Sequence, residues 1–235
     1  MYFYYWDWTY FLLVLPAFFF ALWASARVGS IFRRYQTQYS ARGLTGAQAA
    51  RQVLDRNGLR HIPVERTPGE LSDHYDPVSQ VIRLSQSVYH GTSTAAIGVA
   101  CHEAGHAVQY DQGYTPIRIR TAILPLTRIG SRLALPLILL GIVLGAGASV
   151  FHVMAYVGLA LFALSTIFQL VTLPAEYNAS NRALAAIQEG RLLNENELQG
   201  AKKVLSAAAL TYVAALAVSM TQLLRFGLLL APRRR

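Results

Sequence analysis

Two histidines and a glutamate lie close together in the middle of the sequence, in the order His102, Glu103, Ala104, Gly105, His106. In a helix, residues four positions apart share one face, so the two imidazoles can bind the same zinc ion. Glu103 then lies beside the metal, where it can accept a proton from a zinc-bound water molecule. We therefore predict one Zn²⁺ per chain, with His102 and His106 as ligands and Glu103 as the catalytic base.

A simpler interpretation of this pattern is a pair of exposed histidines on the polar face of a helix. The flanking residues argue against it, because they are small and apolar: Ala95, Ala96, Ile97, Gly98, Val99, Ala100, Ala107 and Val108. Two histidines and a glutamate buried among such residues need a compensating partner, and a metal ion is one. Cys101 precedes a predicted ligand, and we expect it to be a buried structural thiol.

A catalytic zinc usually has three protein ligands and a water molecule, so a third ligand must be found. The metzincin class requires glycine at position 109 and histidine at position 112; Gln109 and Gln112 exclude it. Glu176 is the favoured third ligand, because it directly follows an uncharged segment that we expect to leave the membrane on the side of the histidines. We expect Pro174 to start a helix there. The alternative for Glu176 is a carboxylate that satisfies the helix dipole.

The elements that position the motif are predicted in residues 27–132. A capping box at Thr45–Gln48 opens a helix, and Asn57-Gly58 ends it. Alternating apolar residues predict strands over residues 61–66 and 78–84. The second of these strands could align an extended substrate by β-augmentation.

The helix that carries the zinc motif has its own start and stop signals. Thr92 or Ser93 can cap its first turn, and Gly113 is expected to stop it shortly after Asp111. Residues 117–132 follow, and we expect their arginines to lie at the level of lipid headgroups.

The composition indicates a membrane protein. Charged residues are 14% of the chain and hydrophobic residues 54%, whereas a typical soluble domain has roughly 25% charged residues. Four windows contain no Asp, Glu, Lys or Arg and can each cross a hydrocarbon core of ~30 Å: Trp8–Ala26, Leu133–Phe151, Val153–Ala175 and Val204–Leu224. A turn around residues 145–149 makes the middle two a helical hairpin. Buried helices of a soluble protein are the alternative, but too little polar surface is left to cover them.

The charge distribution predicts the orientation in the membrane. Of 21 Lys and Arg residues, 13 lie in residues 27–132 and 4 in residues 176–203, so 17 would share the cytoplasmic side. The other four follow the last window and would lie outside if it spans fully; a re-entrant last helix removes this conflict, and both alternatives stay open. The predicted divisions are an anchor (1–26), a metallopeptidase domain (27–132), a hairpin (133–175), a helix with the third ligand (176–203) and a transmembrane or re-entrant helix with a basic tail (204–235).

Several motifs together resemble the YugP-like family of bacterial membrane zinc metallopeptidases. They are Gly43–Gly46, Asn57–Leu59, Asp73–Pro77, Arg83–Ser85, Tyr89–Gly91, His102–Ala107 and Leu173–Ser180. The resemblance covers nearly the whole chain and implies a zinc peptidase of the bacterial cytoplasmic (inner) membrane. The pattern is more distantly similar to the HtpX-like and CAAX prenyl proteases, in which an aspartate follows the third ligand by four residues. Ser180 has that position here, and a serine is not expected to orient a histidine as a carboxylate would.

We therefore expect a mainly α membrane protein with about four transmembrane helices and a small α+β zinc-peptidase domain. Its function would be hydrolysis of peptide bonds in peptides or proteins, membrane proteins included, with the active site on the cytoplasmic face. A catalytically silent zinc scaffold is the alternative, although a structural site has no use for Glu103. His74, His90, Tyr177 and Arg182 are weaker candidates for contacts with the substrate or the transition state. Scattered arginines and the lack of a reading module argue against nucleic acid as a partner.

Overall fold

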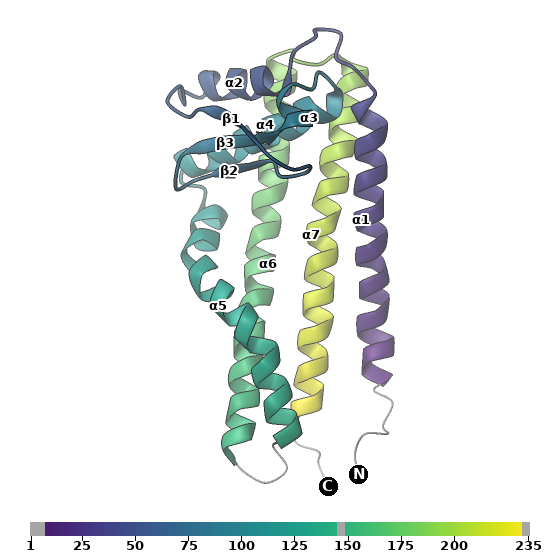
Figure 1. The fold of residues 1–235 in the computed structure, drawn as a ribbon, viewed down its shortest axis with the longest axis vertical. Helices are drawn as coiled ribbons and strands as arrows, with labels where there is room; N and C mark the ends of the chain where they lie inside the picture. Colours follow the sequence, from purple (N-terminus) through teal and green to yellow (C-terminus); the bar gives the residue numbers. More distant parts are fainter. Residues whose placement is uncertain (1–7, 145–148, 232–235) are drawn as a thin grey trace. The chain divides into compact units, whose positions relative to one another are not determined.

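The computed structural model describes residues 8–144 and 149–231 and shows a mainly helical chain with one small sheet (Figure 1). In chain order the elements are the π-helical turn η1 (Tyr10–Val14), α1 (Leu15–Gln36), α2 (Gly46–Arg56), β1 (Val64–Thr67), β2 (His74–Asp76), β3 (Val81–Ser85), α3 (Gln86–Tyr89), α4 (Thr94–Asp111), α5 (Thr115–Leu144), α6 (Ser149–Glu189) and α7 (Glu195–Leu230). Among the described residues, four helices are long and apolar enough to cross a membrane: η1 with α1, then α5, α6 and α7. The predicted fold class is confirmed.

The chain forms two compact units that alternate along the sequence. The first, here called the helical unit, comprises the described residues of Met1–Ala24, Ile119–Leu173 and Thr211–Arg235. The second, called the mixed unit, comprises Ser25–Arg118 and Pro174–Leu210 and contains the sheet and the zinc motif.

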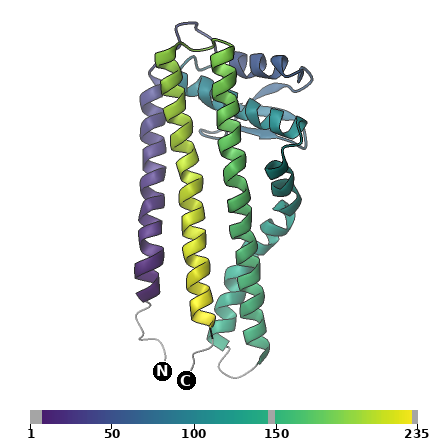
Figure 2. The same ribbon diagram turned by 180° about the vertical axis from the view of Figure 1, so that it is seen from behind.

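In the helical unit, close helix contacts are made by small residues. Figures 1 and 2 both place the second half of α5 beside the start of α6. A side chain at Gly141 would come within 2.6 Å of the Phe151 carbonyl oxygen, and one at Gly158 within 2.8 Å of the Ala134 carbonyl oxygen. Between α6 and α7, the Thr166 and Ser219 hydroxyls are hydrogen-bonded at 2.7 Å. Small residues and buried hydroxyl pairs are typical of helix packing in membranes.

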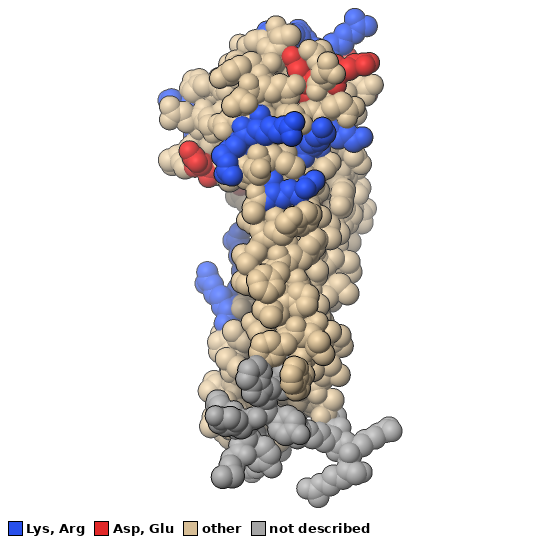
Figure 3. All heavy atoms as spheres, turned by 90° about the vertical axis from the view of Figure 1, so that its right-hand side faces the viewer, with Lys and Arg blue, Asp and Glu red and all other residues tan. Residues whose placement is uncertain are grey.

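The outer surface of the helical unit is apolar. On the face shown in Figure 3, uncharged atoms cover most of this unit. Large hydrophobic side chains are exposed on all four helices, among them Phe19, Leu139, Val157 and Leu224. A hydrocarbon environment suits such a surface, in agreement with the membrane protein predicted from the charge-free windows.

The helices extend beyond the charge-free windows. The structure corrects the helix start predicted at Pro174, because this proline lies inside the continuous helix α6. Interior prolines also occur in α5, at Pro125 and Pro136; neighbouring helices allow such prolines in membrane proteins. α7 starts at Glu195, where Asn194 and Glu197 each accept a hydrogen bond from the other's backbone N–H. The turn predicted around residues 145–149 falls mainly on residues 145–148, which lie outside the described residues.

The sheet of the mixed unit has the strand order β1-β3-β2. β1 is parallel to β3, and β2 is antiparallel to it. The predicted strands start too early: residues 61–63 precede β1, and residues 78–80 form the turn before β3. Gln80 has a φ of +53°, which an extended strand cannot contain. Because β3 is paired on both sides, its backbone cannot accept the substrate strand that we assigned to residues 78–84.

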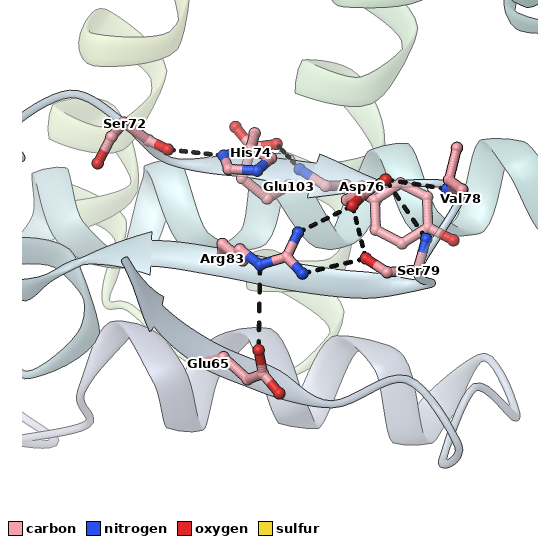
Figure 4. A network of polar contacts seen from close by, with 9 residues as sticks. Glu65, Ser72, His74, Asp76, Val78, Ser79, Arg83 and Glu103 are labelled. Atoms are coloured by element: carbon pink, nitrogen blue, oxygen red, sulfur yellow. Dashed lines mark hydrogen bonds and ion pairs between the residues drawn. The ribbon is translucent and has the colours of Figure 1, made fainter. Parts of the chain in front are cut away.

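β2 was not predicted, because Asp76-Pro77 is a turn signal, and the structure shows how strand and turn coexist. Figure 4 shows the Asp76 carboxylate accepting hydrogen bonds from Ser79 and from the Arg83 guanidinium, the latter at 2.9 Å. These contacts, with the Ser79 hydrogen bond foremost, hold the pKa of Asp76 below its usual range. The stabilisation is present above the pKa of an unfolded aspartate, about 3.9, and is lost as the pH falls through the lower folded pKa.

The core of the mixed unit forms around α4. Ser93 caps this helix by accepting a hydrogen bond from the Ala96 N–H, and Gly113 follows it with a φ of +61°, so both predicted ends are confirmed. The capping box of α2, Thr45 with Gln48, is confirmed as well. Buried residues from α2, β3, α4, α6 and α7 meet in one cluster that includes Leu54, Ile82, Ile97, Ile187 and Leu205.

Small residues on α4 let other helices approach its backbone. A Cβ atom at Gly105 would lie 2.7 Å from the Ala179 carbonyl oxygen of α6. A Cβ atom at Gly98 would lie 3.3 Å from the Ala201 side chain of α7. The glycine inside the zinc motif therefore sets how closely α4 and α6 can pack.

Gly105→Ala is expected to destabilise the protein by about 1–3 kcal/mol, because the backbone of α6 would have to move away from the new methyl group. Thermal unfolding in detergent would measure the change. Gly227→Ala is the matched control: it lies inside α7 with nothing within 4 Å of the added Cβ, so its stability should be unchanged or slightly higher. Equal stability of the two variants would contradict this close packing.

Candidate metal centre

His102, His106 and Glu176 come together in the mixed unit, the first two from α4 and the third from α6. Their ligand atoms all lie within 4.8 Å of one another. Glu176 and His106 are buried, and the His102 side chain retains 14% exposure. The structure thus brings together the three residues that we predicted as ligands.

The distances between these atoms match a tetrahedral zinc site. The Glu176 Oε2 atom lies 3.3 Å from Nε2 of His102 and 3.5 Å from Nε2 of His106. Atoms bound to zinc at about 2.0–2.2 Å and separated by the tetrahedral angle are roughly 3.3–3.6 Å apart. Two imidazole nitrogens and one carboxylate oxygen are also a donor set found in catalytic zinc sites. The residues therefore fit a zinc ion.

Gln109 holds His106 in the orientation that metal binding requires. Its Oε1 atom lies 2.9 Å from His106 Nδ1, while its Nε2 group donates to the Ala175 carbonyl at 2.7 Å and to Asn178 Oδ1 at 2.9 Å. Because Nε2 donates twice, Oε1 is the acceptor and His106 Nδ1 carries the proton. His106 Nε2 is then left with its lone pair toward Glu176, which suits a metal ligand.

A positive charge is favoured between His106 and Glu176. Burial alone would lower the pKa of His106, but the hydrogen bond that a protonated Nε2 donates to Glu176 and the nearby charge of Glu103 outweigh burial and raise this pKa. The same electrostatic environment favours a metal cation at this point.

Ser180 lies beside the other histidine, with its hydroxyl oxygen 3.1 Å from His102 Nδ1. We did not expect a serine to orient a histidine here. The contact is possible because Ser180 follows Glu176 by four residues on α6 and therefore lies on the same helix face. One helix thus provides both the carboxylate of the cluster and a partner for a histidine.

Glu103 follows His102 on α4 and is held in place by the sheet. Its Oε2 atom accepts a hydrogen bond of 3.0 Å from the Tyr75 backbone N–H of β2. Figure 4 shows Glu103 beside this strand, close to His74. Glu103 as a whole is 8% exposed, so the residue is largely shielded from solvent. This position suits a group that exchanges a proton with a molecule at the cluster.

The four weaker candidates lie in different surroundings. His74 is exposed on β2, with Nδ1 2.7 Å from the Ser72 carbonyl oxygen. His90 caps the end of α3 and its ring packs edge-on against Tyr89. Tyr177 is 45% exposed on α6.

Arg182 belongs to the hydrogen-bond network behind His106. It donates to Asn178 Oδ1 at 2.7 Å, and Asn178 in turn accepts a hydrogen bond from Gln109. Its second contact is with Gln112 Oε1, also at 2.7 Å. These contacts indicate a positioning role for Arg182.

Gln109, Tyr75 and Asn178 also belong to this site, although we did not predict them from the sequence. For Gln109 a signal existed: it lies three residues after His106, on the same helix face. Tyr75 contributes only a backbone N–H, and Asn178 meets α4 through the tertiary fold, so neither had a local signal.

Nearly the whole chain matches a known protein family. Residues 10–231 match a family described as "Putative neutral zinc metallopeptidase". The chain belongs to this family. The match includes the zinc motif on α4, the candidate third ligand on α6 and all four candidate membrane helices.

The chain is also similar to a curated protein from Bacillus subtilis (strain 168), named "Putative membrane protease YugP". It is 45% identical over 214 residues, which cover 91% of this chain and 93% of the relative. No solved structure matches the chain.

Gln109→Leu is expected to weaken zinc binding by about 10–100-fold, because His106 loses the acceptor that orients its ring. Zinc affinity would be measured by competition with a chromophoric chelator. Gln112→Leu is the control, since the Gln112 side chain accepts its hydrogen bond from Arg182 and not from a histidine. An affinity unchanged in Gln109→Leu, with the helix content intact, would contradict the role of Gln109.

Proposed function

We propose that this chain is a membrane-embedded zinc metalloprotease in which His102, His106 and Glu176 hold one zinc ion and Glu103 is the general base. The observation that carries the proposal is the convergence of the two Nε2 atoms on Glu176 Oε2, at 3.3 and 3.5 Å, next to a buried glutamate held by the sheet. The membership in a zinc metallopeptidase family supports the same assignment.

Glu103 would perform the proton transfers of peptide hydrolysis. When bound, the zinc ion would polarise the scissile carbonyl and lower the pKa of a water molecule at the site. Glu103 accepts the proton of the attacking water and later gives it to the leaving amine. The Tyr75 N–H holds the carboxylate in one orientation, so that little reorganisation is needed during the reaction.

The substrate would bind along β2. β2 is the edge strand of the sheet next to Glu103, whereas β3 is enclosed between β1 and β2. An extended peptide that lies beside an edge strand presents successive carbonyl groups along it. The Tyr75 N–H is already taken by Glu103, so an added peptide would pair with the remaining backbone groups of this edge and pass close to the base.

The active site would face the cytoplasm of a bacterium, at the inner membrane. The support is the charge distribution: 13 Lys and Arg residues occur in residues 27–132 and 4 in residues 176–203, the two segments that surround the zinc motif and Glu176. Peptides or proteins, membrane proteins included, are the proposed substrates.

Glu103→Gln is expected to retain zinc and lose turnover by about 10²–10⁴-fold, since the amide is nearly isosteric but cannot accept a proton. The glutamine Oε1 can still accept the Tyr75 N–H, so the fold should persist. Cleavage of a general protein substrate and zinc content by mass spectrometry would be measured on the same sample.

Glu176→Ala is the contrasting variant, because it should lose zinc as well as turnover. Full zinc occupancy in Glu176→Ala would exclude Glu176 as the third ligand. A Glu103→Gln variant that binds zinc and cleaves as well as the wild type would favour a silent zinc scaffold over a protease.

A cysteine introduced at Val78 is expected to be labelled by an impermeant thiol reagent only after cells are opened. Val78 is 93% exposed in the turn before β3, so labelling depends only on its side of the membrane. The background is low, because the native Cys101 is fully buried and its burial raises the pKa of its thiol to about 12. Trp8→Cys should be labelled in intact cells. Trp8 lies at the N-terminal end of the first candidate membrane helix, which the predicted orientation places outside the cell. The reverse pattern would contradict the cytoplasmic orientation.

A further inference from the structure

A groove lined by basic side chains lies in the mixed unit, between the end of α1 and the start of α7. Its volume is about 680 Å³. Arg27 and Arg34 line it from α1, and Lys202 and Lys203 from α7. Figure 3, which shows the side of the molecule where α1 lies in Figure 1, has several Lys and Arg side chains close together. No proposed step of peptide hydrolysis uses this groove.

Two of these basic side chains lie close to the same aromatic ring. The Arg34 guanidinium carbon lies 5.7 Å and the Lys203 ammonium 5.9 Å from the centre of the Tyr35 ring. No Asp or Glu is among the described residues that line the groove. Four like charges without an acidic residue among them repel one another, so an anion bound here would stabilise the arrangement.

Apolar residues also line the groove. They are Ile31 of α1 and Ala207 and Leu210 of α7, and Ala207 is buried. Ile31 and Arg34 share a helix face, as do Lys203 and Leu210, since their spacings are three and seven residues. The groove therefore offers positive charge next to hydrophobic side chains.

The groove also lies where two candidate membrane helices become charged. The charge-free window Trp8–Ala26 ends immediately before Arg27, and the window Val204–Leu224 begins immediately after Lys203. Both helices are therefore expected to leave the hydrocarbon region at this level, where lipid phosphates are found.

We propose that this groove is a binding site for an anionic phospholipid, whose phosphate contacts Arg34 and Lys203 while an acyl chain lies along Ile31 and Leu210. Basic pockets between membrane helices bind anionic lipid headgroups in this way. A soluble phosphate offers the same charge but leaves the apolar part of the groove uncovered, so it should bind much more weakly.

The sequence provides an unusually direct test, because Lys202 and Lys203 are the only two lysines of the chain. Full-length protein would be placed in nanodiscs of phosphatidylcholine with or without phosphatidylglycerol. A water-soluble acetylating reagent would then modify the lysines, and mass spectrometry would give the rate. We expect phosphatidylglycerol to slow acetylation by about five-fold, because the bound phosphate would hold the Lys203 ammonium; this factor corresponds to ~1 kcal/mol of interaction per basic residue.

Two controls separate the site from other sources of protection. Arg33→Lys adds an amine next to Arg34 that does not line the groove, and its acetylation should slow much less. Inorganic phosphate in phosphatidylcholine nanodiscs should protect neither lysine. Equal protection at position 33 would indicate a general surface effect, and protection by inorganic phosphate would indicate a soluble anion site; either result would overturn the proposal.

Variants at Arg34 test the groove itself. Arg34→Gln should abolish most of the protection by phosphatidylglycerol, whereas Arg34→Lys, which keeps the charge, should retain it. Zinc content and the elution volume in size-exclusion chromatography would show that both variants are folded. If Arg34→Gln is folded and Lys203 remains fully protected, the lipid is not bound in this groove.

Discussion

The close packing of α4 against α6 is the contact on which the metal centre depends. Gly105 has no side chain, so the Ala179 carbonyl of α6 can approach the backbone of α4 directly. Glu176 is one helical turn before Ala179 and is therefore carried to within 3.5 Å of both histidines. A larger residue at position 105 would separate the two helices and the three ligand atoms together. Gly105, which lies between the two histidines in the zinc motif, thus sets the helix packing, while its neighbours are the candidate ligands and base.

The same pair of helices also fixes the orientation of the ligands. Gln109 of α4 bonds to the Ala175 carbonyl and to Asn178 of α6, and it holds His106 at the same time. Ser180 of α6 contacts His102 of α4. Each histidine is therefore oriented by a neutral partner. Because these partners are uncharged, the negative charges beside the histidines are those of Glu176 and Glu103. Two negative charges suit a dication.

Local signals in the sequence were sufficient for some elements and insufficient for others. The caps of α2 and α4 were predictable because Thr45 and Ser93 act on residues only three positions away. The strand β2 was not predicted because Asp76, at its end, is a residue typical of turns. The ion-pair partner of Asp76, Arg83, lies in the next strand. Pro174 suggested a helix start, yet α6 passes through it; in membrane proteins, groups of neighbouring helices can satisfy the backbone groups that such a proline leaves free.

The site residues that follow a local spacing could be predicted from the sequence, whereas those that only the fold brings together could not. The i, i+4 spacing of His102 and His106 and the unusual position of Glu176 were visible in the chain. The contributions of Tyr75 and Asn178 depend on contacts between distant segments, 28 residues from Glu103 in the first case and 69 from Gln109 in the second. A backbone N–H carries no residue-type signal, so the support that Tyr75 gives to Glu103 could be found only in the structure.

The mixed unit is assembled from two segments that are separated by most of the helical unit, and this order has a consequence during synthesis. His102 leaves the ribosome long before its partner Ser180, which lies 78 residues later. Between them, the chain must produce and insert the apolar segments of α5 and α6. The two histidines therefore exist for some time without Glu176, and the centre is completed only after the hairpin is in place. A nascent chain, or one truncated before α6, would contain both histidines but lack Glu176, so the three residues of the candidate site could not meet.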